Sequence, residues 1–174
     1  MHFDFSEDQR LLQQAVADFL AGECAPDQVR ARWDTETGRD PAFWKRLAEV
    51  GVPGLLVPEA DGGLGLDETD LVLLLEETGR VALAEPVIPT TVGVGLLREI
   101  GGDPAATWLP RVAAGDAILA VGHEQSPFVS DAHVADLLLL PRDGALHAVA
   151  RADARLEAQP ANDGSQRLFR VAFD

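Results

Sequence analysis

The stretch Phe43-Trp-Lys-Arg-Leu-Ala-Glu-Val-Gly-Val-Pro-Gly-Leu-Leu-Val-Pro-Glu-Ala-Asp-Gly-Gly-Leu-Gly-Leu66 decides the fold of this chain. Its first half has apolar residues at helical spacing behind Asp40-Pro41, a cap residue followed by proline at the first helical position. Gly51 ends this pattern. The second half holds too many glycines and prolines for a regular helix. The stretch therefore predicts a short amphipathic helix that leads into an ordered, turn-rich connection.

Helical patterns flank this stretch on both sides. Ahead of it, Ser6 and Gln9 form a capping box before a run of apolar residues at helical spacing. Behind it, we expect a long helix from Asp67, a helix from Thr90 to Ile100, and a further helix opened by Asp103-Pro104. The sequence thus predicts about five helices before residue 116.

Beyond residue 116 the apolar pattern changes to short stretches typical of strands. We expect strands at 117–122, 134–140, 145–150 and 168–173, with Arg142-Asp-Gly-Ala145 as a hairpin turn. The expected fold class is α+β. An all-α helical domain over residues 1–116 is followed by a small, mostly antiparallel β domain over residues 117–174.

Composition excludes several classes of function. With 14 Lys+Arg against 29 Asp+Glu, the formal charge is −15, which argues against nucleic acid as a partner. The apolar runs fall short of the roughly 20 residues that a membrane helix needs. Residues 1–30 do not resemble a targeting peptide, so we expect a cytoplasmic protein and no membrane partner. The four histidines and the single cysteine follow no metal-ligand pattern, so no metal is expected.

Two motifs invite a chemical interpretation, and both are better explained as structure. Asp61-Gly-Gly-Leu-Gly65 follows no strand and lacks the Lys-Ser/Thr of a phosphate-binding loop, so we interpret it as a turn. Glu76 and Glu77 are adjacent on a helix and point about 100° apart, so they cannot share one proton. One of the two is expected to face solvent.

Four blocks taken together are more informative. Phe3-Asp-Phe-Ser-Glu-Asp-Gln9, the stretch from Phe43 to Leu66, Glu76-Glu-Thr-Gly-Arg80 and Trp108-Leu-Pro-Arg-Val-Ala-Ala-Gly-Asp116 resemble, in order and spacing, the amino-terminal half of the acyl-CoA dehydrogenase family. The resemblance implies a helical domain, a middle β domain and a carboxy-terminal helical bundle. This sequence contains the first and a shortened second, and the bundle is absent.

The resemblance also implies ligands and partners. It implies an acyl-CoA substrate, an FAD cofactor between the β domain and the bundle, and a homo- or hetero-oligomer of acyl-CoA dehydrogenase-type subunits. The family's catalytic glutamate belongs to the bundle and would lie beyond Asp174. We therefore name no catalytic residue in this chain.

His123 and Glu124 are the candidate cofactor-binding residues. They stand where the family carries the first two residues of a flavin-contacting Thr-Glu-Pro-Gly-x-Gly-Ser-Asp loop, and the glycines of that loop are missing here. His123 could bond the flavin or the thioester, or be satisfied by a backbone carbonyl. Ser130-Asp131 correspond either to the family's Ser-Asp or, with a deletion after Gln125, to a later segment that follows the family's Lys-Trp-Ile strand.

The helix that contains Thr91, Gly93, Val94 and Gly95 corresponds to the family element that closes the acyl cavity. We predict that these four residues line the substrate pocket. Their two glycines favour either tight packing of neighbouring elements or a cavity widened for a bulky acyl group.

Two functions follow from the resemblance. The first is an acyl-CoA dehydrogenase-like flavoprotein for α,β-desaturation of an acyl-CoA thioester, present here as a partial chain. The alternative is a non-catalytic subunit that supports a catalytic partner and binds no FAD itself. In both cases we expect the chain alone to be inactive.

Overall fold

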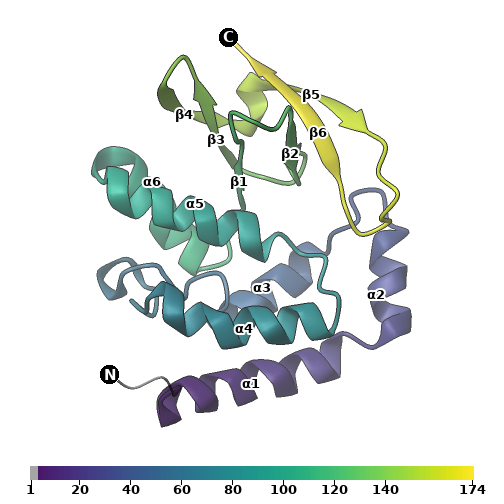
Figure 1. Cartoon of the computed structure of the whole chain (residues 1–174), viewed down its shortest axis with the longest axis vertical. Coiled ribbons are helices and arrows are strands. Elements are labelled where there is room, and N and C mark those ends of the chain that lie inside the picture. Colours follow the sequence, from purple (N-terminus) through teal and green to yellow (C-terminus); the bar gives the residue numbers. More distant parts are fainter. Residues whose placement is uncertain (1–3) are drawn as a thin grey trace.

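The computed structural model describes residues 4–174, so His2 and Phe3 lie outside the described part of the chain. Figure 1 shows stacked helices followed by two small sheets, an order that confirms the α+β prediction. The helices are α1 (Glu7–Glu23), α2 (Pro26–Trp33), α3 (Pro41–Glu49), α4 (Glu68–Arg80), α5 (Val87–Ile100) and α6 (Gly102–Ala113). The strands are β1 (Leu119–Val121), β2 (Phe128–Ser130), β3 (Leu137–Arg142), β4 (Ala145–Ala150), β5 (Ala154–Gln159) and β6 (Leu168–Phe173).

Cap residues begin three of the helices, and the sequence predicts two of these caps, Ser6 and Asp40. The Ser6 side chain accepts the N–H of Gln9 in the predicted capping box of α1. Asp40 and Asp67 accept N–H groups of the first turns of α3 and α4. These caps satisfy donors that have no partner within the helix.

Two helices begin earlier than predicted. α5 begins at Val87, which leaves Pro89 inside its first turn, where a missing N–H costs nothing. α6 begins at Gly102, so Asp103 lies within the first turn and not at the cap. Its acidic side chain still suits the positive end of the helix dipole.

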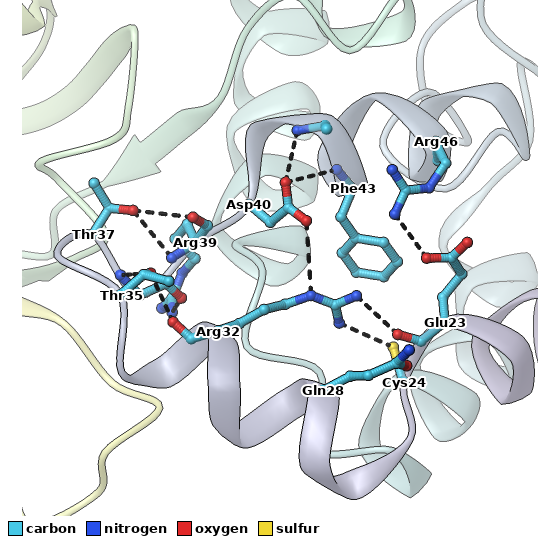
Figure 2. Close-up of polar contacts among 12 residues, drawn as sticks. Glu23, Cys24, Gln28, Arg32, Thr35, Thr37, Arg39, Asp40, Phe43 and Arg46 are labelled. Atoms are coloured by element: carbon cyan, nitrogen blue, oxygen red, sulfur yellow. Dashed lines mark hydrogen bonds and ion pairs between the residues drawn. The ribbon is translucent and has the colours of Figure 1, made fainter.

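The sequence pattern did not predict α2, because Val29 is its sole buried residue and the helix shows no apolar stripe. Figure 2 shows how its Arg32 ties neighbouring helices together. The guanidinium donates to the carbonyl of Glu23 at 2.8 Å and lies 4.0 Å from the ring centre of Phe43. Arg46 of α3 pairs with the Glu23 carboxylate at 2.7 Å. Polar contacts therefore hold α2 against the end of α1 and against α3.

A contact between α1 and α4 explains why one of the adjacent glutamates, Glu76 and Glu77, is buried and the other is exposed. Glu77 is buried, accepts a hydrogen bond from Gln13 at 2.8 Å and pairs with Arg80 at 3.0 Å. Glu76 is exposed. The prediction that one of them faces solvent is confirmed, and the buried one joins two helices.

The strands form two three-stranded sheets, ordered β1-β3-β4 and β2-β6-β5. β1 pairs with β3 in parallel, and every other pairing is antiparallel. The predicted hairpin between β3 and β4 turns at Asp143 and Gly144, both with positive φ, as a type I′ two-residue turn requires. β2 and β5 were not predicted. The last helix ends at Ala113 and the first strand begins at Leu119, on either side of the predicted domain boundary at residue 116, which stays a prediction.

Helix α5 packs directly against the β unit (residues 117–174). The buried Thr90 hydroxyl lies 3.3 Å from both the N–H and the carbonyl oxygen of Leu119 in β1. Figure 1 shows α5 directly beneath β1. Within the described residues, no helix has both the length and the apolar character needed to cross a bilayer.

Candidate functional site

His123 and Glu124 lie in the exposed connection from β1 to β2. They line a groove of about 200 Å³ between the two sheets, whose walls include Val129, Leu140 and Phe173. The Nδ1 atom of His123 accepts the N–H of Gln125 at 3.1 Å, so the ring meets a backbone amide and not the carbonyl considered from sequence. A neutral imidazole bonded in this way carries its proton on Nε2.

The β1–β2 connection offers few free backbone donors to a flavin. Its own hydrogen bonds use the N–H groups of Gln125, Ser126 and Phe128, and residue 127 is a proline without one. Gly122 is not a ligand cradle, because a Cβ there would lie 3.0 Å from the Leu140 side chain. The backbone donors that would meet a flavin are thus largely occupied. With its donors occupied, the connection does not fit FAD.

The predicted pocket residues divide between the two faces of α5. The Thr91 hydroxyl donates to the carbonyl of Val87 at 2.9 Å, and Val94 is fully buried. A Cβ at Gly93 would lie 2.8 Å from Leu119, so this glycine permits close approach of α5 to β1. Gly95 faces the other way, and a Cβ there would have no atom of a neighbouring element within 4 Å. Of the four, only Gly95 adjoins open space.

The two groups of candidate residues do not share a site within this chain. The groove that His123 and Glu124 line contains no residue of α5. Among the described residues, no cluster of three or more His, Cys, Asp and Glu side chains is placed to hold a metal ion. The predicted cofactor and pocket residues therefore remain predictions.

A buried polar joint between the helices and the β unit escaped the sequence reasoning. Arg39 and Asp131 are 7% and 6% exposed and form an ion pair at 2.5 Å. Arg39 also donates to the carbonyl of Ser165 at 3.0 Å. Burial raises the pKa of Asp131 to about 6, while the charge of Arg39 acts in the opposite direction. No short-range pattern connects residues so far apart in sequence.

His133 and Arg167 extend this joint. The Nε2 atom of His133 lies 2.7 Å from the carbonyl oxygen of Thr37, and burial lowers the pKa of the ring. Arg167 donates to the carbonyl of Trp33 at 2.6 Å. The segment between α2 and α3 is therefore clamped by two separate loops of the β unit, and it fixes how the β unit sits on the helices.

Comparison with known proteins agrees with this architecture. Residues 6–116 match the family model of the acyl-CoA dehydrogenase N-terminal domain. Acyl-CoA dehydrogenase IpdE2 of Mycolicibacterium smegmatis is 33% identical over 135 residues, which cover 77% of this chain and 42% of that protein. IpdE2 of Mycobacterium tuberculosis is 30% identical over 166 residues, 95% of this chain and 51% of that protein. The chain thus spans about half the length of these relatives.

Solved structures show the same fold. A variant of the Tcur3481–Tcur3483 steroid ACAD matches with a TM-score of 0.83 at 25% identity, covering 97% of this chain and 55% of that one. The ChsE4–ChsE5 complex from Mycobacterium tuberculosis matches with a TM-score of 0.83 at 22% identity, covering 100% and 56%. Together with the family match over residues 6–116, the four sequence blocks and the helical architecture lead to one conclusion: the chain belongs to the acyl-CoA dehydrogenase family.

Proposed function

We propose that this chain is the supporting subunit of an acyl-CoA dehydrogenase assembly in which a partner chain holds the FAD. The assembly's reaction is the α,β-desaturation of an acyl-CoA thioester. The observation that carries the proposal is the β1–β2 connection, which lacks the family's glycines and uses its backbone donors internally. The alternative, a subunit that holds its own flavin, would require this connection to open.

Desaturation removes a proton from the α-carbon and a hydride from the β-carbon of the thioester. We assign neither transfer to a side chain of this chain. Its contribution is to bind the partner subunit. The outer face of α5 presents Ile88, Val92 and Ile100, which are 62%, 49% and 52% exposed. An exposed apolar stripe of this kind favours contact with a partner. The heteromeric ChsE4–ChsE5 neighbour supports this arrangement.

The partner surface is tested by charge substitution on the α5 stripe (Ile88, Val92 and Ile100). Val92→Glu should abolish association in sedimentation experiments, because a carboxylate would be buried at the interface. Leu11→Glu on α1 is the matched control, since Leu11 is 63% exposed and lies away from α5. A strictly monomeric wild-type chain at high concentration, which also fails to bind any family subunit, would contradict the proposal.

For the substrate we propose a ring-bearing or branched acyl-CoA. The face of α5 at Gly95 is open in this chain, so a partner chain that covers this face leaves room there for a bulky acyl group, and the similarity to a steroid ACAD supports the same substrate class. In the full assembly, Gly95→Leu should block the bulky substrate and spare a short straight-chain one. Gly79→Leu is the control, because Gly79 also has open space around it but lies on α4. Equal turnover of both substrates by the Gly95 variant would refute the pocket.

The flavin assignment has a direct test. The purified chain alone should lack the visible absorbance of bound flavin, and the purified assembly should show it. Stoichiometric flavin on the isolated chain would favour the alternative function. A flavin-free assembly that still desaturates acyl-CoA would contradict both.

A further inference from the structure

Strand β4 has an open edge. It pairs with β3 on one side, and among the described residues no segment forms backbone hydrogen bonds to its other side. A groove of about 680 Å³ is lined by all four residues from His147 to Ala150. Because successive side chains point to opposite faces of a sheet, a groove that all four line follows the edge of the strand. The outward backbone groups of β4 are therefore open to a further strand.

This edge has none of the features that usually keep edge strands apart. Charged side chains, prolines and bulges protect such strands in native proteins. β4 reads Ala-Leu-His-Ala-Val-Ala, without an acidic residue, a lysine, an arginine or a proline, and its register with β3 is unbroken. Its Leu146 is 38% exposed. The six-residue edge strand of the other sheet, β5, carries the exposed charges of Arg155 and Glu157. The edge of β5 is therefore protected, whereas that of β4 is not.

We propose that β4 pairs with β4 of a second copy of this chain, antiparallel and about a two-fold axis at Ala148. The two copies then share one six-stranded sheet. In this register Leu146 lies opposite Ala150 of the second copy, so a large side chain meets a small one. His147 lies opposite Val149 of the second copy, whereas an axis at His147 would place two imidazole rings against each other. The register also keeps the more exposed face of each strand on one side of the shared sheet.

The charges around β4 favour a second copy as the occupant. Each chain has a net charge of −15, so two copies repel each other unless they meet where charge is balanced. Arg142 and Asp143 precede β4, and Arg151 and Asp153 follow it, so residues 142–153 carry no net charge. Antiparallel pairing brings the start of each strand to the end of the other. Each end of the pair therefore holds arginines and aspartates together.

Matched variants test the pairing on the isolated chain by sedimentation equilibrium. The wild type should form a dimer and no larger particle. Ala148→Lys and Ala148→Glu each place two like charges at the two-fold axis, so each should weaken self-association by about tenfold or more. An equimolar mixture of the two variants should recover the dimer, because lysine then lies opposite glutamate. Ala158→Lys is the control, since Ala158 is exposed on the edge strand β5, and it should self-associate as the wild type does.

Amide hydrogen exchange of the wild type is a second readout, which decides the question even if a variant fails to fold. Alternate amides of β4 should become protected as the concentration rises, and those of β5 should not. A monomeric wild type, a dimer with unprotected β4 amides, folded Ala148 variants that dimerise normally, or a mixture that stays monomeric would overturn the proposal.

The self-association of β4 does not rest on the proposed function, because no flavin-bearing subunit is present in these experiments. Val92→Glu concerns the contact between α5 and that subunit, so this variant should still form the β4 dimer. Loss of one interface with retention of the other would show which of the two proposals fails.

Discussion

The helical part of the molecule, residues 4–116, and the β unit, residues 117–174, are stabilised in different ways. The helical core contains large side chains with no exposure to solvent, such as Phe43 and Leu47. In the β unit the enclosed cluster is rich in alanine, and aromatic residues such as Phe169 and Phe173 are only partly buried. The main core therefore spans both regions, because Leu119, Leu137 and Leu139 of the β unit belong to it, whereas the β unit's own cluster is small and leaves its aromatic residues only half-buried.

This difference parallels the family resemblance. All four sequence blocks that carry the resemblance lie in the helical part, and the departures at His123 and Gln125 lie in the β unit. A well-enclosed core tolerates few changes, because interior packing is as dense as a crystal of small molecules. The loops of a half-open β unit have fewer packing constraints. The family's sequence signature thus lies in the helices, although the solved structures match the fold of both regions, and sequence features particular to this chain are expected in the β unit.

The largest expected effect concerns activity. The 174-residue chain alone should show no acyl-CoA-dependent reduction of an electron acceptor, because its β1–β2 connection does not fit the flavin. Activity should appear when a flavin-bearing family subunit is added. Measurable turnover by the isolated chain would show that the β unit is a complete catalytic element and would break the comparison.

Two phenylalanines sharpen the comparison of cores. An arginine lies 4.0 Å from the ring centre of both, Arg32 over Phe43 and Arg142 over Phe173, but only Phe43 is fully buried. Phe43→Ala should lower the free energy of unfolding by about 3–5 kcal/mol, as is typical for a core aromatic residue. Phe173→Ala should cost about 1 kcal/mol. Urea denaturation of both variants is the measurement, and equal losses would mean that the β unit is as tightly packed as the helices.

The sequence allowed prediction where local chemistry decides the structure. The side chains of Ser6, Asp40 and Asp67 cap helices whose first turns lie within a few residues in the sequence. Such helix starts can be recognised from a short stretch of sequence. α2 was missed because Arg32 holds it through partners on other helices, and not through an apolar stripe. β2 and β5 have too few buried residues to show alternation.

The candidate site was predictable only in part, for the same reason. Resemblance pointed to α5 and to His123, but only the fold could show that Gly93 packs against Leu119 while Gly95 faces open space. The pair of Arg39 and Asp131 depends on a contact between distant segments. No spacing rule along the sequence encodes such a contact.

Substitution of two glycines on α5 tests how tightly this helix packs against β1 of the β unit. Alanine normally stabilises a helix by about 1 kcal/mol relative to glycine, so Gly95→Ala, in open space, should raise stability by roughly that amount. Gly93→Ala should instead destabilise by about 1–3 kcal/mol, because its Cβ would overlap Leu119 of β1. Opposite signs in thermal unfolding would support tight packing of α5 against β1. A stabilised Gly93 variant would mean that the β unit moves aside easily.

The smallest expected effect is a pH dependence at the polar joint. The pKa of Asp131 is about 6 in the folded chain against 3.8 for the ordinary carboxyl group, because burial disfavours its charge more than Arg39 and Arg167 favour it. The folded state therefore binds a proton at a pH where the unfolded state does not. Asp131 contributes stability that is fully present below pH 3.8 and is lost as the pH rises through about 6.

Comparison with Asp131→Asn isolates this contribution. Lowering the pH from about 7 to about 5 should stabilise the wild type relative to the variant by about 1 kcal/mol. His133 acts in the opposite direction, because its pKa is lowered by burial and its stabilising effect is lost on acidification, but it is present in both proteins. Urea denaturation at the two pH values gives the difference. If the variant gains as much on acidification as the wild type, the carboxylate of Asp131 is solvated, and the joint is looser than its burial indicates.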